Sequence, residues 1–424
     1  MSFSARQLLV AALLTAAAGI AAAAEKPNII LIISDDHAFN EYGFMGAKHV
    51  RTPNLDRLAE QSVLFTRGYA TPVCSPSLAT LLTGLYPHQH GITGNDMKND
   101  RADRTTLSTR LLQNPLILPK ALGDAGYLTL QTGKLWNMSY QQAGFTDGMT
   151  GPQSRHGGEG LDIGRKTMQP IKDFINKATD AGKPFFVWYA PMLPHDPHTP
   201  PERLLKKYLG KGPTPAAEKY YAMIEWFDET CGELDAFLEQ KRLTEKTLVI
   251  YLADNGWNAE QGRNGGRAKM SPYELGIRTP VMARWPGKLT PRRDDETLAS
   301  IIDIVPTILS AAGLQPPAPL PGVNLMDSAA LTARKTIFVE SYTHDVADIQ
   351  DPAKSLMAAV VIDDSFKLIL PSRAKSDKPF ATVPNTPELY DLKTDPLEKQ
   401  NLAAEKPDVV KRLKALQSSF WKFD

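Results

Sequence analysis

The chain has 424 residues, 42% of them hydrophobic, which is enough for two or three average domains or for one large α/β domain with a small companion. Its 48 lysines and arginines nearly balance its 47 aspartates and glutamates. Because neither sign of charge generates a long-range field, this balance argues against nucleic acid or an acidic membrane surface as the main partner.

Residues 1–24 have the parts of a cleavable secretory signal peptide. Arg6 supplies the positive charge, Leu8–Ala18 the apolar run, and Ala22–Ala24 the small residues before a cleavage site at Glu25. A membrane anchor is the alternative, but the apolar run is short for a bilayer span, and no later stretch is long and apolar enough. The sequence therefore predicts a periplasmic or secreted protein without a membrane span.

The first apolar run of the expected mature chain, Asn28–Ile33, predicts a strand that is buried on both faces of a parallel sheet. Asp35 and Asp36 follow at its carboxyl end, where open α/β sheets bind their ligands. Adjacent carboxylates resist burial unless a cation offsets their charge, and their hard oxygens suit calcium or magnesium. An Asx turn with a helix cap is the alternative for this pair taken alone.

Further strands and helices are indicated by the same kinds of pattern. We expect helices over Asn54–Gln61 (with Thr52 as its N-cap), Leu116–Ala125 and Ala216–Lys241, and strands over Val63–Thr66, Tyr127–Gln131, Pro184–Ala190 and Thr247–Ala253. The last strand delivers Asp254 and Asn255 at its end. With Asp35 and Asp36 they offer four hard oxygen donors from two strand ends, which fits one calcium completed by a nucleophile and a substrate oxygen.

Cys74 lies in a short loop between two prolines, and Ser77–Thr83 predicts a brief helix that stops at Gly84. The thiol is therefore expected near a helix N-terminus, where unpaired amides favour an anion. A disulfide with Cys231 would suit an exported protein. However, Cys231 falls on the apolar stripe of a predicted helix, where a buried free thiol is ordinary, so two free thiols are favoured.

A proline-rich segment, Gln315–Pro321, is the expected boundary between domains. It divides a large α/β domain, residues 25–320, from a small C-terminal α+β domain, residues 321–424. The smaller part should contain strands near Thr336–Ser341, Met357–Ile362 and Phe366–Leu370 and a closing helix over Pro407–Phe420.

Taken in order, these segments resemble the formylglycine-dependent sulfatases of the alkaline-phosphatase superfamily over nearly the whole mature chain. C-S-P-S-L at Cys74–Leu78 is similar to the family's C-x-P-x-R, and P-H-D-P at 194–197 to its P-H-x-P. Two longer motifs are Lys269–Pro280, similar to K-x-x-x-Y-E-x-x-x-R-x-P, and Leu389–Leu402, which matches L-Y-D-L-x-x-D-P-x-E-x-x-N-L. The resemblance implies a large domain with a mixed, mostly parallel sheet sandwiched by helices, plus a small C-terminal α+β domain.

The same resemblance implies a complete site. Its nucleophile is formylglycine, which a maturation enzyme makes by oxidising Cys74. The implied calcium ligands are Asp35, Asp36, the residue at position 74, Asp254 and Asn255. The implied sulfate-binding lysines are Lys134 and Lys269, and the implied general acid is His195.

Two positions depart from the family pattern. Leu78 replaces the signature arginine, and Trp136 replaces the histidine of the family's G-K-W-H. Arg67, Arg101 and Arg104 are candidates to take the place of the missing arginine.

Three functions follow from these residues. The favoured one is hydrolysis of sulfate esters on a sulfated carbohydrate. The others are a phosphodiester or phosphonate ester hydrolase of the same superfamily, and a non-catalytic homologue that keeps calcium and binds sulfated glycans. Specificity is expected from the loops Asn95–Arg110, Gly151–Arg165 and Thr343–Pro352.

Overall fold

The computed structural model describes residues 26–97, 100–136, 138–151, 158–262, 266–375 and 382–423. The predicted signal peptide, residues 1–24, lies outside this part of the chain. Within it, none of the helices combines the length and the hydrophobicity that crossing a bilayer requires.

A large twisted sheet forms the centre of the molecule. Its strands are β1 (Asn28–Ser34), β2 (Val63–Tyr69), β4 (Leu128–Gly133), β5 (Asp147–Gly148), β6 (Phe185–Ala190), β7 (Thr247–Ala253), β8 (Arg278–Arg284) and β9 (Arg292–Ser300). They lie in the order β5-β4-β6-β1-β7-β8-β2-β9. Only β8 runs antiparallel to its neighbours. The prediction of a mixed, mostly parallel sheet is confirmed.

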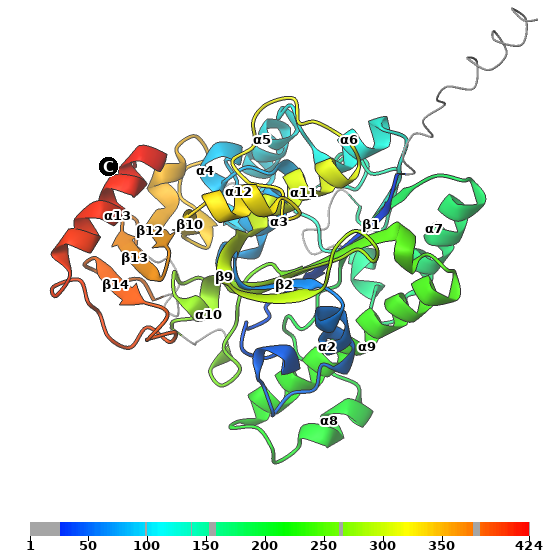
Figure 1. The fold of residues 1–424 in the computed structure, drawn as a ribbon, viewed down its shortest axis with the longest axis horizontal. Coiled ribbons are helices and arrows are strands. Elements are labelled where there is room, and N and C mark those ends of the chain that lie inside the picture. The colour runs from blue at the N-terminus through cyan, green and yellow to red at the C-terminus, as the bar shows by residue number, and fades with distance from the viewer. Residues whose placement is uncertain are drawn as a thin grey trace, which may run out of the picture.

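Helices cover both faces of this sheet (Figure 1). The helices of one face include α3 (Cys74–Thr83), α5 (Asp100–Leu112), α6 (Leu118–Asp124), α11 (Ile304–Ala311) and α12 (Ser328–Ala333). Those of the other are α2 (Pro53–Glu60), α7 (Gln169–Asp180) and α9 (Pro215–Gln240). Alternate residues of β1 belong to the two cores: Ile29, Leu31 and Ile33 pack on the α3 side, Ile30 and Ile32 on the α9 side. This double burial is why the strand is a continuous apolar run.

A smaller antiparallel sheet lies beside the large one, at the left of Figure 1. Its strands are β10 (Thr336–Tyr342), β12 (Leu356–Asp363), β13 (Phe366–Pro371) and β14 (Glu388–Asp391), in the order β10-β12-β13-β14, and α13 (Pro407–Phe420) packs against it. Short helices α4 (Pro87–His90), α8 (Glu202–Tyr208) and α10 (Glu274–Ile277), and a two-stranded ladder of β3 (Asp96–Met97) and β11 (Asp345–Val346), complete these elements. The C-terminal α+β part is confirmed, whereas its boundary at residue 320 stays a prediction.

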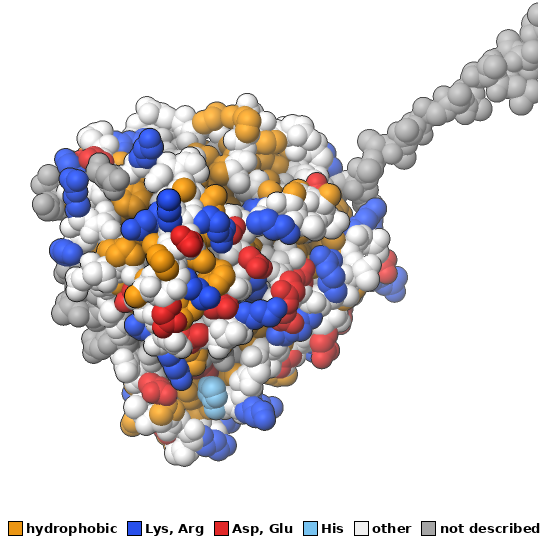
Figure 2. All heavy atoms as spheres, turned by 60° about the vertical axis from the view of Figure 1, so that its left-hand side comes forward, with side chains coloured by type: hydrophobic (Ala, Val, Ile, Leu, Met, Phe, Trp, Pro, Cys, Tyr) orange, Lys and Arg blue, Asp and Glu red, His pale blue; other side chains and the backbone are white. Residues whose placement is uncertain are grey.

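The surface and the thiols agree with the sequence analysis. Figure 2 shows acidic and basic side chains interspersed over the face it presents, as the balanced composition predicts. Cys74 and Cys231 are both buried and free, so the disulfide alternative is wrong.

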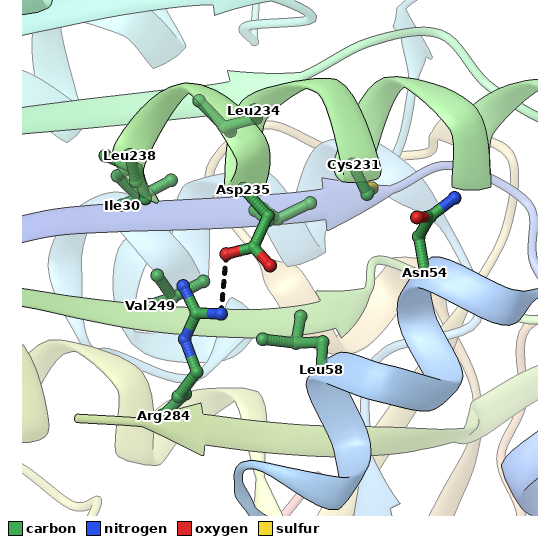
Figure 3. A pocket seen from close by; sticks show the side chains of 10 residues that line it. Ile30, Asn54, Leu58, Cys231, Leu234, Asp235, Leu238, Val249 and Arg284 are labelled. Carbon is green, nitrogen blue, oxygen red and sulfur yellow. Dashed lines mark ion pairs between the residues drawn. The ribbon is translucent and has the colours of Figure 1, made fainter. Parts of the chain in front are cut away.

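A pocket on the α9 side of the sheet is drawn in Figure 3. Apolar side chains of α2, α9 and the sheet line it, and Asp235 and Arg284 point toward one another, with Oδ1 and Nη1 2.6 Å apart. Its lining includes Cys231, whereas Cys74 belongs to α3 on the opposite face. This pocket is therefore separate from the predicted site.

Candidate active site

The four predicted oxygen ligands meet at the carboxyl ends of β1 and β7. These strands are parallel and in register, with Ser34 opposite Ala253, so Asp35 and Asp36 emerge beside Asp254 and Asn255. The backbone N–H of Asp36 donates to Asp254 Oδ1 at 3.2 Å, and Asn255 Nδ2 donates to Asp36 Oδ1 at 2.7 Å. Two sequence segments more than 200 residues apart thus form one cluster.

One oxygen of each of these side chains is buried and lacks a hydrogen bond. Among the described residues, no donor is bonded to the following atoms: Asp35 Oδ1, Asp36 Oδ2, Asp254 Oδ2 and Asn255 Oδ1. The four residues are at most 2% exposed, so water does not solvate them freely. Buried oxygens without partners are costly. A ligand atom of Asp35 lies within 4.8 Å of one of Asp254 in one group and of one of Asp36 in another, and hard oxygens this close fit a calcium-type cation.

Cys74 lies at the edge of the same cluster. Its Sγ belongs with Asp35 and Asp254 to a group whose ligand atoms lie within 4.8 Å of one another. Cys74 is itself the first residue of α3, so the helix begins earlier than the sequence pattern predicts. Ser77, one turn along, donates from Oγ to the carbonyl oxygen of Asp254 at 2.6 Å and ties the helix to the strand end.

Asn95 contacts Cys74 and was not predicted as a site residue. Its Nδ2 lies 3.7 Å from Cys74 Sγ, and its Oδ1 accepts from the backbone N–H of Ser75 at 3.1 Å. The sequence assigned Asn95 only to a specificity loop, because no local pattern links it to a residue 21 positions earlier.

Both predicted lysines reach the carboxylates. Lys134 follows β4 and donates from Nζ to Asp35 Oδ2 at 2.7 Å. Lys269 donates from Nζ to Asp36 Oδ1 at 2.5 Å. Their side chains are 6% and 10% exposed, so both charges are held in a largely dry environment.

His195 closes the cluster from the loop after β6. Its Nε2 lies 3.5 Å from Asp36 Oδ2, and its Nδ1 lies 3.1 Å from Asp196 Oδ1. The side chain is only 5% exposed. Every predicted site residue is therefore present in one buried group.

The electrostatics of the group indicate a missing positive charge near Asp254. Burial raises the pKa of Asp36, but Lys269, His195 and Lys134 outweigh it and hold that pKa below its usual range. Burial, together with Asp35 and the Cys74 thiol, raises the pKa of Asp254 well above its usual value. Lys134 also acts on Asp254, but it does not outweigh the burial and the neighbouring acidic groups there.

The two departures from the family pattern lie in the hydrophobic core. Leu78 is 2% exposed and belongs to the core on the α3 side. Trp136 is 1% exposed in the same core, and its Nε1 has no hydrogen-bond partner among the described residues. Leu78 therefore packs as an ordinary core residue of α3.

Two of the three arginines proposed as substitutes, Arg67 and Arg104, pair with groups other than Cys74. Arg67 donates to the carbonyl oxygens of Glu296 and Asp364, and Arg104 pairs with Asp96 at 3.4 Å. The side chain of Arg101 lies outside the described part. Lys134 and Lys269 are close enough to Cys74 to interact with it electrostatically.

Two of the three predicted specificity loops meet near Cys74. β3 and β11 pair Asp96 with Asp345, and the backbone N–H of Asn95 donates to the carbonyl oxygen of His344 at 2.7 Å. Residues 152–157 of the third loop lie outside the described residues. At its end, Arg165 donates to the carbonyl oxygen of His195 at 3.2 Å.

Comparison with known proteins identifies the family. A sequence model of the sulfatase family matches residues 27–314. The chain belongs to the sulfatase family. A second model, described as the C-terminal part of N-sulphoglucosamine sulphohydrolase, matches residues 264–422.

Among curated relatives, this sulfatase-family chain is similar to N-acetylgalactosamine-6-sulfatase of Canis lupus familiaris, with 29% identity over 69% of this chain and 64% of the relative. The match thus spans less than two thirds of that relative's length. It is also similar to N-acetylgalactosamine-6-O-sulfatase of Bacteroides thetaiotaomicron, with 26% identity over 93% of each chain.

Solved structures share the fold. The sulfatase PsFucS1 from Pseudoalteromonas sp. matches with a TM-score of 0.70 and 21% identity, over 97% of this chain and 93% of that one. The phosphonate monoester hydrolase of Agrobacterium radiobacter matches with a TM-score of 0.65 and 22% identity, over 93% and 95%. At these identities the likeness establishes the architecture alone, so both chemistries occur on this fold.

Proposed function

We propose that this protein is a sulfatase that hydrolyses sulfate esters of a sulfated carbohydrate. Family membership supports the reaction class, and the names of its relatives support a carbohydrate substrate. The observation that carries the proposal is the cluster itself, in which four buried oxygens without hydrogen bonds and two largely buried lysines lie together with Cys74 at its edge. A sulfate ester needs positive charge at its oxygens and a nucleophile in line with its sulfur, and this cluster fits both needs.

The residues present fit a calcium ion. Asp35, Asp36, Asp254 and Asn255 would hold it through the oxygens that lack hydrogen-bond donors. When bound, it would supply the counter-charge that Asp254 lacks and would polarise a sulfate oxygen. Lys134 and Lys269, which donate to Asp35 and Asp36, would add further positive charge for the substrate's anionic group.

Position 74 is where the nucleophile would stand. If Cys74 is converted to formylglycine, its hydrate supplies the hydroxyl that attacks sulfur. Residues of this chain orient that position: α3 begins there, Asn95 bonds the next amide, and Ser77 ties the helix to Asp254. Leu78 does not alter this backbone anchoring, because its side chain packs into the core.

His195 is the proposed proton donor for the leaving alcohol. Burial lowers the pKa of its imidazole to about 3, so the free site holds it neutral. A bound sulfate ester would raise this pKa by adding negative charge beside the ring. The proton would then be available when the S–O bond breaks and the alkoxide forms.

Two measurements on one preparation test the proposal. Mass spectrometry of the peptide around Cys74, from a host that makes formylglycine, should show loss of the thiol in favour of the aldehyde. Sulfate release should then be detected across a panel of sulfated mono- and oligosaccharides, and an aryl sulfate should be cleaved faster than an aryl phosphate diester.

Other outcomes would replace the proposal. Faster cleavage of the phosphate diester would favour the phosphodiesterase or phosphonate hydrolase reaction. An intact thiol, together with glycan binding but no turnover, would indicate a non-catalytic homologue that binds sulfated glycans.

A further inference from the structure

Lys269 is carried by a strap, residues 266–277, that contains only one short helix, α10. The strap reaches the site at its tip, where the backbone N–H of Met270 donates to the carbonyl oxygen of Pro72 at 2.8 Å. Met270 itself has a φ of 67°, in the left-handed region that a residue with a side chain adopts at a cost. Local structure alone therefore does not fix Lys269, and its position depends on contacts made by the rest of the strap.

The base of the strap is held by a buried group of charges from three segments. Lys367 of β13 is fully buried, with its Nζ 3.0 Å from Glu274 Oε1 and 2.7 Å from Glu398 Oε1. Glu398 Oε2 also accepts from the backbone N–H of Glu274 at 2.6 Å. Both carboxylate side chains are 2% exposed. Glu274 and Glu398 are the glutamates of the Y-E and D-P-x-E motifs, to which the proposed function gives no role.

Further contacts tie the strap to the C-terminal part. Arg267 donates from Nη1 to the carbonyl oxygen of Glu398 at 2.6 Å, and its guanidinium lies 4.2 Å from the ring centre of Tyr273. Tyr273 in turn donates from its hydroxyl to Glu388 Oε2 at 2.8 Å. Thus Glu398 holds the strap through a side-chain oxygen and through its own carbonyl.

Such a buried group is sensitive to the loss of one member. Removing one charge leaves its partners buried without full compensation, and the strap has little regular structure to resist a shift. Glu398 and Lys367 are not in the cluster around Cys74, so they act on it through the strap that carries Lys269.

We propose that Lys367, Glu274 and Glu398 are positioning residues that hold Lys269 against Asp36 and the substrate anion. The C-terminal sheet would then contribute to the reaction without touching the substrate. This inference rests on the proposed function for its consequence in catalysis, but not for its structural part.

The test compares Glu398→Gln with a matched control, Asp363→Asn. A glutamine at position 398 must turn its NH₂ group toward either Lys367 or the Glu274 amide, both of which are donors. Asp363 is a buried carboxylate of the same small sheet that pairs with Arg412 and accepts from Thr336, away from the strap. We expect Glu398→Gln to lower kcat/KM for sulfate release by at least about tenfold, because small misplacements of a catalytic group have large effects. Asp363→Asn should stay within about twofold.

A double-mutant cycle separates positioning from general damage. In a Lys269→Ala background, Glu398→Gln should change kcat/KM by less than about twofold, because the group through which it acts is gone. An undiminished tenfold loss in that background would overturn the proposal, as would an equal loss in Asp363→Asn.

Acetylation of Lys269, followed by mass spectrometry, supplies a readout that does not depend on turnover. Its side chain is 10% exposed in the folded protein, so acetylation should be slow and should accelerate several-fold in Glu398→Gln but not in Asp363→Asn. Unchanged labelling would overturn the positioning role. If Lys269 is labelled faster in Glu398→Gln but the wild-type protein releases no sulfate, the positioning role is retained and the proposed function is rejected.

Discussion

At the scale of single residues, the site contains both carboxylate oxygens that accept hydrogen bonds and buried carboxylate oxygens that accept none. Asp254 accepts from the Asp36 amide with one oxygen and leaves the other buried and unbonded. Asp35, at the end of the neighbouring strand, likewise has one buried oxygen without a hydrogen bond, while its other oxygen accepts from Lys134. Two carboxylates that leave one buried oxygen each unbonded destabilise the free protein and favour a bound cation.

Asp254→Ala should abolish stabilisation by calcium. In the wild-type protein, calcium at about a hundred times its dissociation constant should raise the free energy of unfolding by about 2.7 kcal/mol, whereas the variant should show no rise. In a chelator the variant should melt at or above the wild-type temperature, because a repelling buried carboxylate has been removed. Thermal melts with calcium and with chelator measure both effects.

Asp228→Asn is the control for this experiment. Asp228 is also buried, but it lies on α9 and binds the first amides of α2. Its substitution should lower the melting temperature without changing the calcium-dependent increment. A wild-type protein that ignores calcium would mean that the four side chains are only turn residues.

At the scale of elements, the strap depends on close backbone approach. A Cβ at Gly276 would lie 2.3 Å from the carbonyl oxygen of Ala268 and 2.4 Å from that of Ser271. A Cβ at Gly256 would lie 1.9 Å from the carbonyl oxygen of Leu275. These glycines let the strap fold onto itself and lie against the loop after β7.

Gly276→Ala should therefore destabilise the protein by about 1–3 kcal/mol, because backbone atoms must move to admit the methyl group. The same displacement should speed acetylation of Lys269. Gly123→Ala is the matched control, since Gly123 lies in α6 and a Cβ there meets no atom within 4 Å. That control should stabilise by about 0.5–1 kcal/mol. Equal melting temperatures for the two variants would contradict the tight packing of the strap.

At the scale of the whole molecule, buried histidines make stability depend on pH. His90 is fully buried: its Nδ1 accepts from the backbone N–H of Ile92 at 3.0 Å, and its Nε2 lies 3.2 Å from Thr80 Oγ1. Burial, helped by the neighbouring His88, lowers its pKa to about 3. An unfolded histidine has a pKa of about 6.5, so between these values only the unfolded state binds the proton.

Stability should thus be complete above pH 6.5 and fall as the pH drops toward 3, by about 1.4 kcal/mol per pH unit for this one residue. His90→Gln should be less stable at neutral pH, because a buried contact is lost. The slope of its unfolding free energy against pH should be smaller by the contribution of about one proton. Urea unfolding between pH 4.5 and 7.5, at fixed calcium, measures the slope. An unchanged slope would mean that His90 is protonated in the folded protein.

The sequence by itself determined the family and several buried strands, and it predicted which residues lie together in the candidate site, but it did not indicate the strands β8 and β9. Residues such as Ile29–Ile33 are apolar on both faces because the strand is buried on both, and this burial can be predicted from the run itself. Asp35, Asp36, Asp254 and Asn255 could be grouped because carboxyl ends of parallel strands share one edge of a sheet.

Only the tertiary structure decided the contacts that join distant segments. Thr52 was the predicted cap of α2, yet its side chain makes no capping bond, and Asp228 of α9 binds those amides instead. Asn95 at Cys74, and the meeting of Glu274, Glu398 and Lys367, likewise link residues whose separation follows no period. Local sequence patterns indicate how each element is buried. The contacts of these side chains, in contrast, depend on which distant segments pack against them once the chain has folded.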